Sequence, residues 1–305
     1  MRLHHIELID AILRTGSLTE AAEALHISQP AASKLLANAE IRLGYKLFER
    51  IKGRLHPTRE ADILTPQIAR LKQELVSLRT LAHNLKHLQQ GHLRVGSTPA
   101  VGLGLLPTVI RRVHERQPGI TFHLNTHHTS ELVAGLQARE LDLVVTYDTA
   151  DRPGIKRIPL GQTELVLVSR SVRQNPIPLS EIPREPFIAL EARDPSGIVL
   201  HQALDAQNLQ LDVITEVQTH YVACAMVEAG CGNTIVDLIT ARAMLRPGLF
   251  LNRLSPPLPV PINAMVHAAD PMSAQHTLLL DILKTTCAEQ AWQKVMGDPA
   301  FGIDA

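Results

Sequence analysis

The sequence predicts an α/β protein with three parts: an N-terminal helical module that ends in a β-hairpin, a long linker helix, and a two-lobed α/β body. Three observations predict this organisation. Two short helical segments and a basic hairpin occupy residues 1–58, a glycine-free apolar heptad pattern occupies residues 59–90, and strands alternate with helices in two series within residues 91–305. A chain of 305 residues is long enough for two or more domains of ordinary size.

The net charge of the whole chain is zero, but the charge is unevenly distributed. Residues 1–90 contain 13 Lys and Arg against 9 Asp and Glu, whereas the other 215 residues contain 17 against 21. A basic front end on an acidic body is typical of a module that meets nucleic acid, joined to a part with another task. Aromatic residues make up only 3% of the chain, too few for a surface that stacks the bases of single strands.

Composition also indicates where the protein resides. There is no run of 18 apolar residues that could span a membrane, and Glu7 and Asp10 interrupt the stretch in which a signal peptide would be apolar. The cysteines Cys224, Cys231 and Cys287 are too few for a disulfide framework and form no CxxC pair. We therefore expect a reduced, cytoplasmic protein without membrane contacts.

Residues 17–25 predict the first of two short helices joined by a tight turn. Ser17 and Glu20 fit a capping box, in which each side chain binds a backbone amide of the other residue. The helix that follows is rich in alanine, so another helix can approach it closely. His26 and Ile27 then interrupt the helical pattern.

A second helix is expected from Ser28, a good N-cap, to Leu43, because Gly44 suits the left-handed position after a helix. Pro30 falls in the first turn, where its missing amide costs little. The apolar positions have a 4-3-4 spacing and form one buried stripe: Ala32, Leu36, Ala39 and Leu43. Three polar side chains lie off this stripe, where they can hydrogen-bond base edges or phosphates: Gln29, Ser33 and Lys34.

Two extended runs around a basic turn follow, at residues 46–50 and 54–58. They predict a hairpin wing whose basic side chains contact the DNA backbone. Two short helices followed by such a wing have the geometry of a winged helix-turn-helix. The alternative is an ordinary helical hairpin, but this alternative does not explain the basic β-hairpin that follows the two helices. We therefore expect DNA contacts from eight residues: Ser28, Gln29, Pro30, Ser33, Lys34, Arg50, Lys52 and Arg54.

The segment GSLTEAAEALHISQPAASKLLANAEIRLGYKLFERIKGRLHPT resembles the winged helix-turn-helix of LysR-type transcriptional regulators. Those proteins typically carry G-S-F-T-x-A-A-x-x-L-x-x-S-Q-P-A-x-S, then L-G-x-x-L-F-x-R and a T-x-x-G ending. The part from Lys46 to Thr58 is most similar to the lysine-biosynthesis regulator and its opine-responsive relatives. The chain departs from the pattern at Leu18, Ala39 and Ala61, none of which is a DNA-facing position.

The resemblance covers nearly the whole chain, strongly in the first 60 residues and loosely after residue 92. It implies an effector domain similar to periplasmic binding proteins, with an effector in the cleft between two lobes. The stretch THYVACAMVEAGCGNTIV is similar to the second lobe of the lysine regulator. The resemblance also implies an oligomer that binds an interrupted palindrome in double-stranded DNA, with RNA polymerase as a further candidate partner.

The linker helix is expected to pair with a copy of itself. After Thr58, a plausible N-cap, apolar residues follow a strict 4-3 alternation: Leu64, Ile68, Leu71, Leu75, Leu78, Ala82 and Leu85. This is a coiled-coil seam, whereas a helix packed on its own domain would show a wider apolar stripe. Pro66 lies near the start and can kink the helix. We expect a dimer through this helix, and a tetramer built from such dimers.

The body is expected to form two α/β units with a cleft between them, because strands alternate with helices in two series. The first series has strands at 92–96, 120–125 and 141–147 and helices at 105–117 and 130–139. The second has strands at 186–190, 213–217 and 233–236 and helices at 197–207 and 221–229. A strand at 260–267 returns to the first unit and a helix at 274–291 closes it. Lobe I is then about 91–165 with 266–295, and lobe II about 166–265.

Ligands of open α/β sheets bind at the carboxyl ends of strands, beside helix N-termini. Five loops reach such ends, and their hydroxyl groups suit a small carboxylate or an amino acid. The residues expected to bind the effector are Ser97, Thr98, Thr129, Ser130, Tyr147, Ser196, Thr219 and His220. Each hydroxyl could instead cap its own helix. Asp148 and Asp194 could accept the ammonium group of an amino acid or cap local turns.

Other residue patterns indicate no enzyme, metal site or cofactor. His123, His127 and His128 lack partners at ligand spacing, and alternation points the last two apart, so we expect surface histidines. Cys224 and Cys231 are expected in the core rather than as a redox pair. No nucleophile elbow, phosphate-binding loop or zinc-protease motif occurs.

Two functions remain: an effector-controlled DNA-binding regulator, or a solute-binding or enzymatic α/β protein whose front helices serve assembly. An assembly module has no reason to place Gln29, Ser33 and Lys34 outward beside a basic wing. The sequence therefore favours the regulator, and it does not identify the effector or the target genes.

Overall fold

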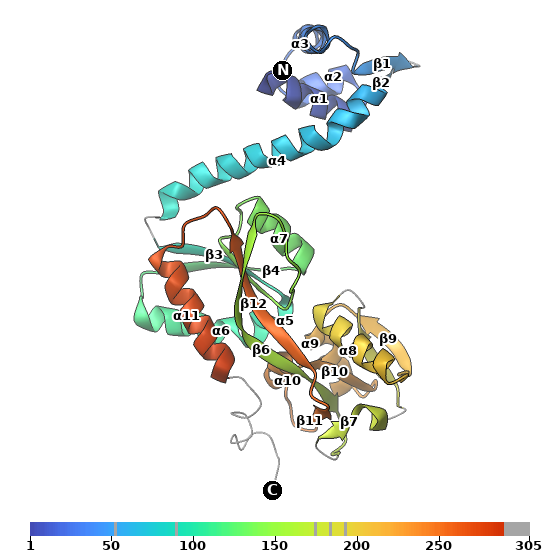
Figure 1. Ribbon diagram of the computed structural model, residues 1–305, viewed down its shortest axis with the longest axis vertical. Helices are drawn as coiled ribbons and strands as arrows, with labels where there is room; N and C mark the ends of the chain where they lie inside the picture. The colour runs from blue at the N-terminus through green and yellow to red at the C-terminus, as the bar shows by residue number, and fades with distance from the viewer. Residues whose placement is uncertain (52–53, 89–90, 174–175, 183–184, 192–193, 290–305) are drawn as a thin grey trace. The chain divides into compact units, whose positions relative to one another are not determined.

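The computed structural model describes residues 1–51, 54–88, 91–173, 176–182, 185–191 and 194–289. Beyond Leu78, only the backbone of the linker helix is described. The chain forms two compact units, Met1–His83 and Asn84–Ala305 (Figure 1).

The N-terminal unit combines helices with a two-stranded antiparallel hairpin. Its elements are α1 (Leu3–Thr15), α2 (Leu18–Ala24), α3 (Gln29–Leu43), β1 (Phe48–Ile51), β2 (Arg54–Pro57) and α4 (Arg59–Leu88). Helix α2 begins at the predicted cap, since Ser17 Oγ accepts a hydrogen bond from Glu20 N at 3.4 Å. The reciprocal half of the predicted capping box is replaced, because Ser17 N–H donates to Thr15 Oγ1 at 3.3 Å.

Helix α3 has the ends that the sequence predicts. Ser28 Oγ accepts from Ala31 N at 3.4 Å, and Gly44, at a φ of +81°, donates its N–H to Glu40 O at 2.8 Å. Between α2 and α3, His26 adopts a φ of +55°. Left-handed backbone is uncommon outside glycine, although histidine is enriched there. This residue makes the turn tight enough for α2 and α3 to pack against each other.

The core of the N-terminal unit is made mainly of aliphatic side chains, which come from all of its helices. Leu8, Ile9 and Ile12 of α1 pack with alanines of α2 and α3, so the helices approach closely. The predicted stripe of α3 faces this core: Ala32 and Ala39 are buried, and Leu36 and Leu43 pack against it in part.

The apolar heptad positions of α4 lie in two different environments. Leu64 and Ile68 pack into the core of the N-terminal unit, which is the alternative that the sequence disfavoured. Leu71 and Leu78 are exposed, at 44% and 60% of their surface. The side chains of Ala82 and Leu85 lie outside the described part of the structure. Among the heptad positions whose side chains the structure describes, those from Leu71 onward therefore lie outside this core and are available to a seam.

The second unit is built around a mixed sheet with helices on both faces. Its strands are β3 (His92–Ser97), β4 (Thr121–Thr126), β5 (Leu143–Thr146), β6 (Ile155–Ser169), β7 (Ile177–Pro178), β8 (Phe187–Leu190), β9 (Val213–Val217), β10 (Asn233–Asp237), β11 (Phe250–Ser255) and β12 (Pro259–His267). Its helices are α5 (Pro99–Gly104), α6 (Leu106–Arg116), α7 (Thr129–Gln137), η1 (Leu179–Glu181), α8 (Pro195–Ala206), α9 (His220–Glu228), α10 (Leu238–Ala243) and α11 (Ala274–Glu289).

Strands β6 and β12 join two lobes (Figure 1). The strand order is β4-β3-β5-β12-β6-β10-β8-β9, with β11 also paired to β6 and β7 paired to β11. The first part of β6 pairs with β12, and its last part, from Leu165 to Ser169, pairs with β10 and β11. Strands β3, β4 and β5 are parallel in one lobe, as are β8, β9 and β10 in the other. The predicted two-lobed α/β body is confirmed.

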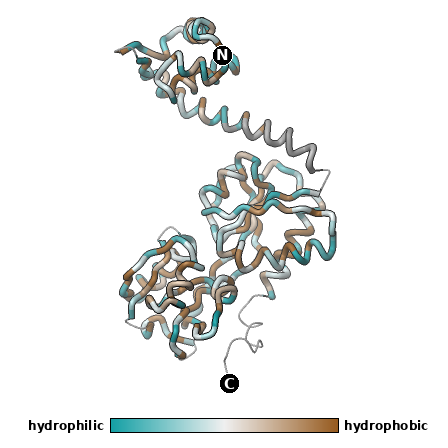
Figure 2. The backbone as a smooth tube through the Cα atoms, turned by 180° about the vertical axis from the view of Figure 1, so that it is seen from behind, coloured by the Kyte–Doolittle hydropathy of each residue, from teal (hydrophilic) through white to brown (hydrophobic). Residues whose placement is uncertain are grey.

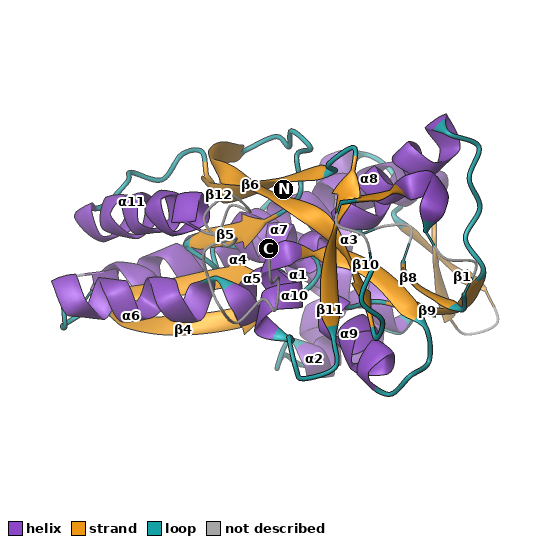
Figure 3. Ribbon diagram, turned by 90° about the horizontal axis from the view of Figure 1, so that it is seen from below, coloured by secondary structure: helices purple, strands orange, loops and turns teal. Residues whose placement is uncertain are grey.

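The lobes have apolar interiors, which appear as brown stretches in Figure 2. Helices α6 and α11 lie side by side against the first lobe's sheet (Figure 3). The helix expected over residues 105–117 is found as α6, and the glycine-rich helix α5 before it was not predicted. One local prediction was wrong. Cys231 is exposed because it lies in the turn after α9, whereas Cys224 is buried as expected.

Candidate DNA interface and effector cleft

The start of α3 presents polar side chains to solvent. Gln29, Ser33 and Lys34 are all exposed, and all lie off the buried stripe of the helix. Gln29 and Ser33 are four residues apart, so they share one face. A glutamine amide and a hydroxyl can both donate to and accept from base edges in the major groove, and a lysine can pair with phosphate.

The other residues expected at the start of α3 have local roles. Ser28 places its hydroxyl on Ala31 N, so it caps the helix while remaining exposed. Pro30 lies in the first turn and is exposed as well. Both therefore shape the end of the helix that would approach DNA.

Two of the three basic side chains of the wing that are expected to contact DNA lie within the described part of the structure. Arg50 and Arg54 are exposed on neighbouring strands, where Arg50 pairs with Leu55 and Arg54 with Ile51. Lys52 lies outside the described residues. Phe48, at the start of β1, is buried in the core of the N-terminal unit and anchors the hairpin.

Glu40 has a structural role that was not predicted from the sequence. Its buried carboxylate accepts hydrogen bonds from Leu47 N at 2.9 Å and Phe48 N at 3.4 Å, and pairs with Lys46 Nζ at 2.6 Å. It therefore fixes the wing to α3. Its place four residues after Leu36, beside the apolar stripe, is the signal that could have identified it.

Ser97 and Thr98, at the end of β3, are the strongest candidates for binding an effector. Ser97 is fully buried and Thr98 is 9% exposed, and neither hydroxyl has a hydrogen-bond partner among the described residues. Gly102 leaves room for Ser97, since a Cβ there would lie 2.8 Å from Ser97 Oγ. A buried hydroxyl without a partner is costly, by about 1–3 kcal/mol, so an acceptor supplied by a ligand would be favourable.

Three of the expected residues meet in one buried network at the junction of the lobes. His220 Nδ1 lies 2.6 Å from Asp237 Oδ2, and His220 Nε2 lies 3.3 Å from Asp194 Oδ1 and 3.0 Å from Ser196 Oγ. Tyr147, from the first lobe, donates its hydroxyl to Asp237 Oδ1 at 2.9 Å. The phenol of Tyr147 thus joins the first lobe to the second.

The charges in this network stabilise one another. Burial alone would lower the pKa of His220, but the charge of Asp237 and the hydrogen bond to Asp194 raise it to about 10. Burial alone would raise the pKa of Asp194, but the hydrogen bond and charge of His220 lower it to about 2. Burial and the charge of Asp237 raise the pKa of Tyr147 well above its ordinary value. An imidazolium between two carboxylates is therefore the neutral-pH state.

The two lobes also touch through short helices near this network. Helix α5 of the first lobe packs on α10 of the second. A Cβ at Gly104 would lie 2.5 Å from the Ile239 side chain and 2.8 Å from its carbonyl oxygen, so the contact requires glycine. Ser97 and Thr98 immediately precede α5, which brings the first lobe's hydroxyls to the lobe junction.

The other residues expected to bind the effector differ in exposure and in hydrogen-bond partners. Thr129 Oγ1 lies 3.2 Å from Thr146 Oγ1, and Ser130 is exposed in the first turn of α7. Neither Thr98 nor Thr219 caps the helix that follows it with its hydroxyl. The cap of α8 is Asp194, whose carboxylate accepts from Ser196 N.

The two aspartates considered for an ammonium group are both engaged within the chain. Asp194 caps α8 and pairs with His220. Asp148 accepts from Ala150 N at 2.9 Å and pairs with Arg152 Nη2 at 2.7 Å. Both carboxylates therefore already have partners within the chain.

Other predicted features concern metals and membranes. His123, His127 and His128 are exposed, as the sequence analysis expected. The described residues contain no cluster of His, Cys, Asp or Glu side chains that could hold a metal ion. Among the helices of the described part, none combines the length and the apolar character that crossing a membrane requires.

Comparison with known proteins gives consistent matches along the chain. A family described as "Bacterial regulatory helix-turn-helix protein, lysR family" matches residues 3–62, and one described as "LysR substrate binding domain" matches residues 86–288. The HTH-type transcriptional regulator DgcR of Pseudoalteromonas sp is 38% identical over 87% of this chain and 92% of its own.

Two further relatives extend this comparison. The transcriptional activator protein LysR of Escherichia coli (strain K12) is 30% identical, with 90% of this chain and 89% of its own covered. The structure of full-length CbnR complexed with target DNA has a TM-score of 0.60 at 19% identity, with 94% and 100% covered. This structural likeness extends over both units of the chain and supports the fold.

Proposed function

The chain belongs to the LysR family of transcriptional regulators, and from that premise we propose which of its residues read DNA and which hold its effector. It is a DNA-binding regulator with an effector-binding domain, and not an enzyme. We assign residues 1–58 to DNA binding, 59–90 to the linker and dimerisation, and 91–305 to effector binding. Because its partner is DNA, we place the protein in the cytoplasm of a bacterial cell.

We propose that α3 enters the major groove and the wing holds the backbone. The exposure of Gln29, Ser33 and Lys34 at the start of α3 supports this role. Gln29 and Ser33 would read bases, while Lys34, Arg50 and Arg54 would pair with phosphates. Ser33→Ala is then expected to relax the sequence preference measured by selection from random DNA. A variant that selects the same sequences as the wild type would refute the reading role of Ser33.

Two copies of the chain would bind the two halves of an interrupted palindrome. The exposed leucines of α4, Leu71 and Leu78, are available to pair with a second copy. Regulators of this family bind DNA and oligomerise, and the CbnR structure is a complex with its target DNA. We extend this to a dimer through the second half of α4, and to a tetramer built from such dimers.

We propose that the effector is a small carboxylate or an amino acid held where the two lobes meet. The observation that carries this proposal is the pair of buried hydroxyls of Ser97 and Thr98, for which the described part of the chain supplies no hydrogen-bond partner. These hydroxyls would donate to the ligand's carboxylate, and each charge-assisted hydrogen bond is worth about 1.5–3 kcal/mol.

The test is calorimetry of the full chain with a panel of amino acids and simple organic acids. For an acid that binds, Thr98→Val is expected to weaken binding by about tenfold to a hundredfold, as one lost charge-assisted bond implies. The same substitution should leave the unfolding free energy unchanged or slightly higher, because it removes an unpartnered buried hydroxyl. Thr285→Val, which changes an exposed threonine of α11, is the matched control. Binding of neutral or cationic compounds alone, or unchanged acid affinity in a Thr98→Val, Ser196→Ala double variant, would refute the site.

A further inference from the structure

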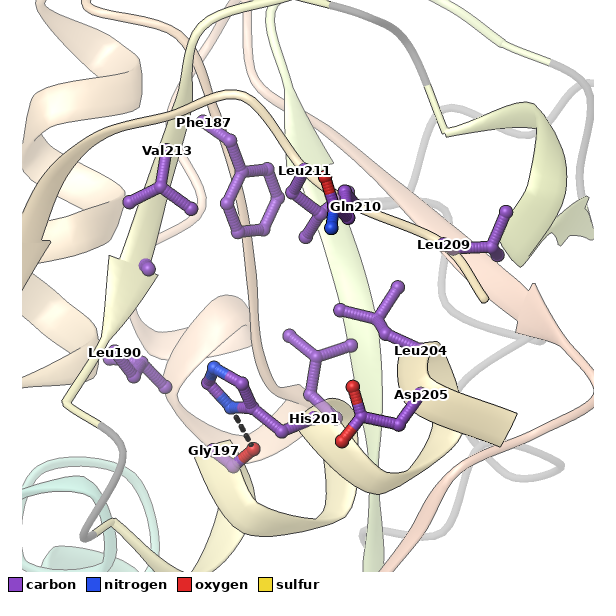
Figure 4. Close-up of a pocket in the computed structure, with 12 residues that line it drawn as sticks. Phe187, Leu190, Gly197, His201, Leu204, Asp205, Leu209, Gln210, Leu211 and Val213 are labelled. Carbon is purple, nitrogen blue, oxygen red and sulfur yellow. Dashed lines mark hydrogen bonds between the residues drawn. The ribbon is translucent and has the colours of Figure 1, made fainter. Parts of the chain in front are cut away.

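A pocket lies wholly within the second lobe, between α8 and the strands β8 and β9 (Figure 4). It has a volume of about 270 Å³. Its floor is formed by buried apolar side chains of strand β8 and helix α8: Phe187, Ala189, Leu190, Leu200 and Leu204. An apolar cavity of roughly 150 Å³ takes up benzene, so this pocket has room for an aromatic ring with a short side chain.

The mouth of the pocket is polar and presents acceptors. His201, Asp205 and Gln210 line it and are exposed. His201 Nδ1 donates to Gly197 O at 2.8 Å, so Nε2 of the neutral ring is left as an acceptor. Asp205 lies four residues after His201, on the same face of α8. Figure 4 shows His201, Leu204 and Asp205 facing Phe187, Leu211 and Val213 across the pocket.

We propose that this pocket is a second ligand site, for a small aromatic amine. The ring would lie on the apolar floor against Phe187, and the ammonium group would donate to Asp205 and to Nε2 of His201. A carboxylate in the same position would meet the negative charge of Asp205 and an imidazole acceptor, so acids are disfavoured. The site therefore selects the charge opposite to that of the effector proposed at the lobe junction, and does not depend on it.

The experiment is calorimetry of the full-length chain with 2-phenylethylamine as the probe and 3-phenylpropanoate as its acidic counterpart. One amine is expected to bind per chain. Asp205→Asn, an exposed substitution that leaves the fold intact, should weaken amine binding at least tenfold, and Ala189→Leu should abolish it by filling the floor. Glu216→Gln, an exposed acidic residue of β9 outside the pocket, is the matched control and should bind as the wild type does.

Thr98→Val separates the two sites, because it is expected to bind the amine as the wild type does, whether or not a carboxylate binds elsewhere. The proposal is overturned if the amine does not bind, if Asp205→Asn binds it as tightly as the wild type, or if the acid binds equally well. Amine binding that weakens as the chain concentration rises would assign the pocket to a second copy of the chain, and would also overturn it.

Discussion

Replacing His220 by glutamine is expected to destabilise the second lobe strongly. Glutamine retains groups that can hydrogen-bond, but it removes the cation that lies between the buried carboxylates of Asp194 and Asp237. His220 is 4% exposed and Asp237 is fully buried, so solvent does little to screen the remaining charges. Removing one partner of a buried ion pair typically costs about 3–5 kcal/mol. The predicted loss in the free energy of unfolding at pH 7 lies in this range.

The same substitution should change the pH dependence of stability. The pKa of His220 is about 10 in the folded chain, above its ordinary value of 6.5. The stability that this raised pKa contributes is complete below pH 6.5 and is lost as the pH rises toward 10. In between, each pH unit removes about 1.4 kcal/mol. The wild type should thus lose about 2 kcal/mol between pH 7 and pH 8.5, and His220→Gln should lose none from this group.

Urea unfolding of the full chain, followed by circular dichroism at both pH values, measures these effects. His123→Gln, which removes an exposed histidine of β4, is the control and should behave as the wild type at either pH. If His220→Gln were as stable as the wild type at pH 7, or if both proteins had the same pH slope, the imidazolium between two carboxylates would be refuted.

Three further predictions concern the other contacts described. Glu40→Ala should speed hydrogen exchange of the Leu47 and Phe48 amides more than tenfold, because the oxygen that accepts from both amides is removed; exchange as slow as in the wild type would contradict this role. Replacing Leu71 and Leu78 together by Asp should abolish dimers in sedimentation, because unpaired charge in an apolar seam is costly. A double variant that sediments as the wild type does would contradict the coiled-coil seam. Tyr147→Phe should lower the free energy of unfolding by about 1.5–3 kcal/mol while keeping the pH slope, and a lost slope would show that the phenol, not His220, governs it.

The sequence predicts those elements whose signals are local. Helix α3 begins and ends where Ser28 and Gly44 indicate, because a cap and a left-handed glycine act within a few residues. The alternating strands and helices of the body are likewise found near the expected positions. Strand β6 escaped prediction because Pro159 and Gly161 interrupt its apolar pattern, and the register against β12 shifts at Ile262 and Asn263. Pairing with a distant strand, not local propensity, forms it.

The residues of the candidate sites also divide into those with a local signal in the sequence and those that only the fold brings together. Exposure of Gln29, Ser33 and Lys34 follows from helical periodicity and could be predicted. The network at the lobe junction could not, because Asp194, His220 and Asp237 lie far apart in sequence and each resembles an ordinary residue at a helix start. Only the fold brings the N-termini of α8, α9 and α10 together around one imidazole.

The central claim, that α3 and the wing bind DNA through specified side chains, is tested most directly by the salt dependence of DNA affinity. Fluorescence anisotropy of the full chain on a selected palindrome gives the slope of log affinity against log salt concentration. Arg50→Ala is expected to weaken binding to all sequences and to flatten this slope by about one unit for each arginine lost. Arg116→Ala, an exposed arginine of the second unit, should leave the slope unchanged. An Arg50→Ala variant with the wild-type slope would contradict the assignment of the wing to the DNA backbone.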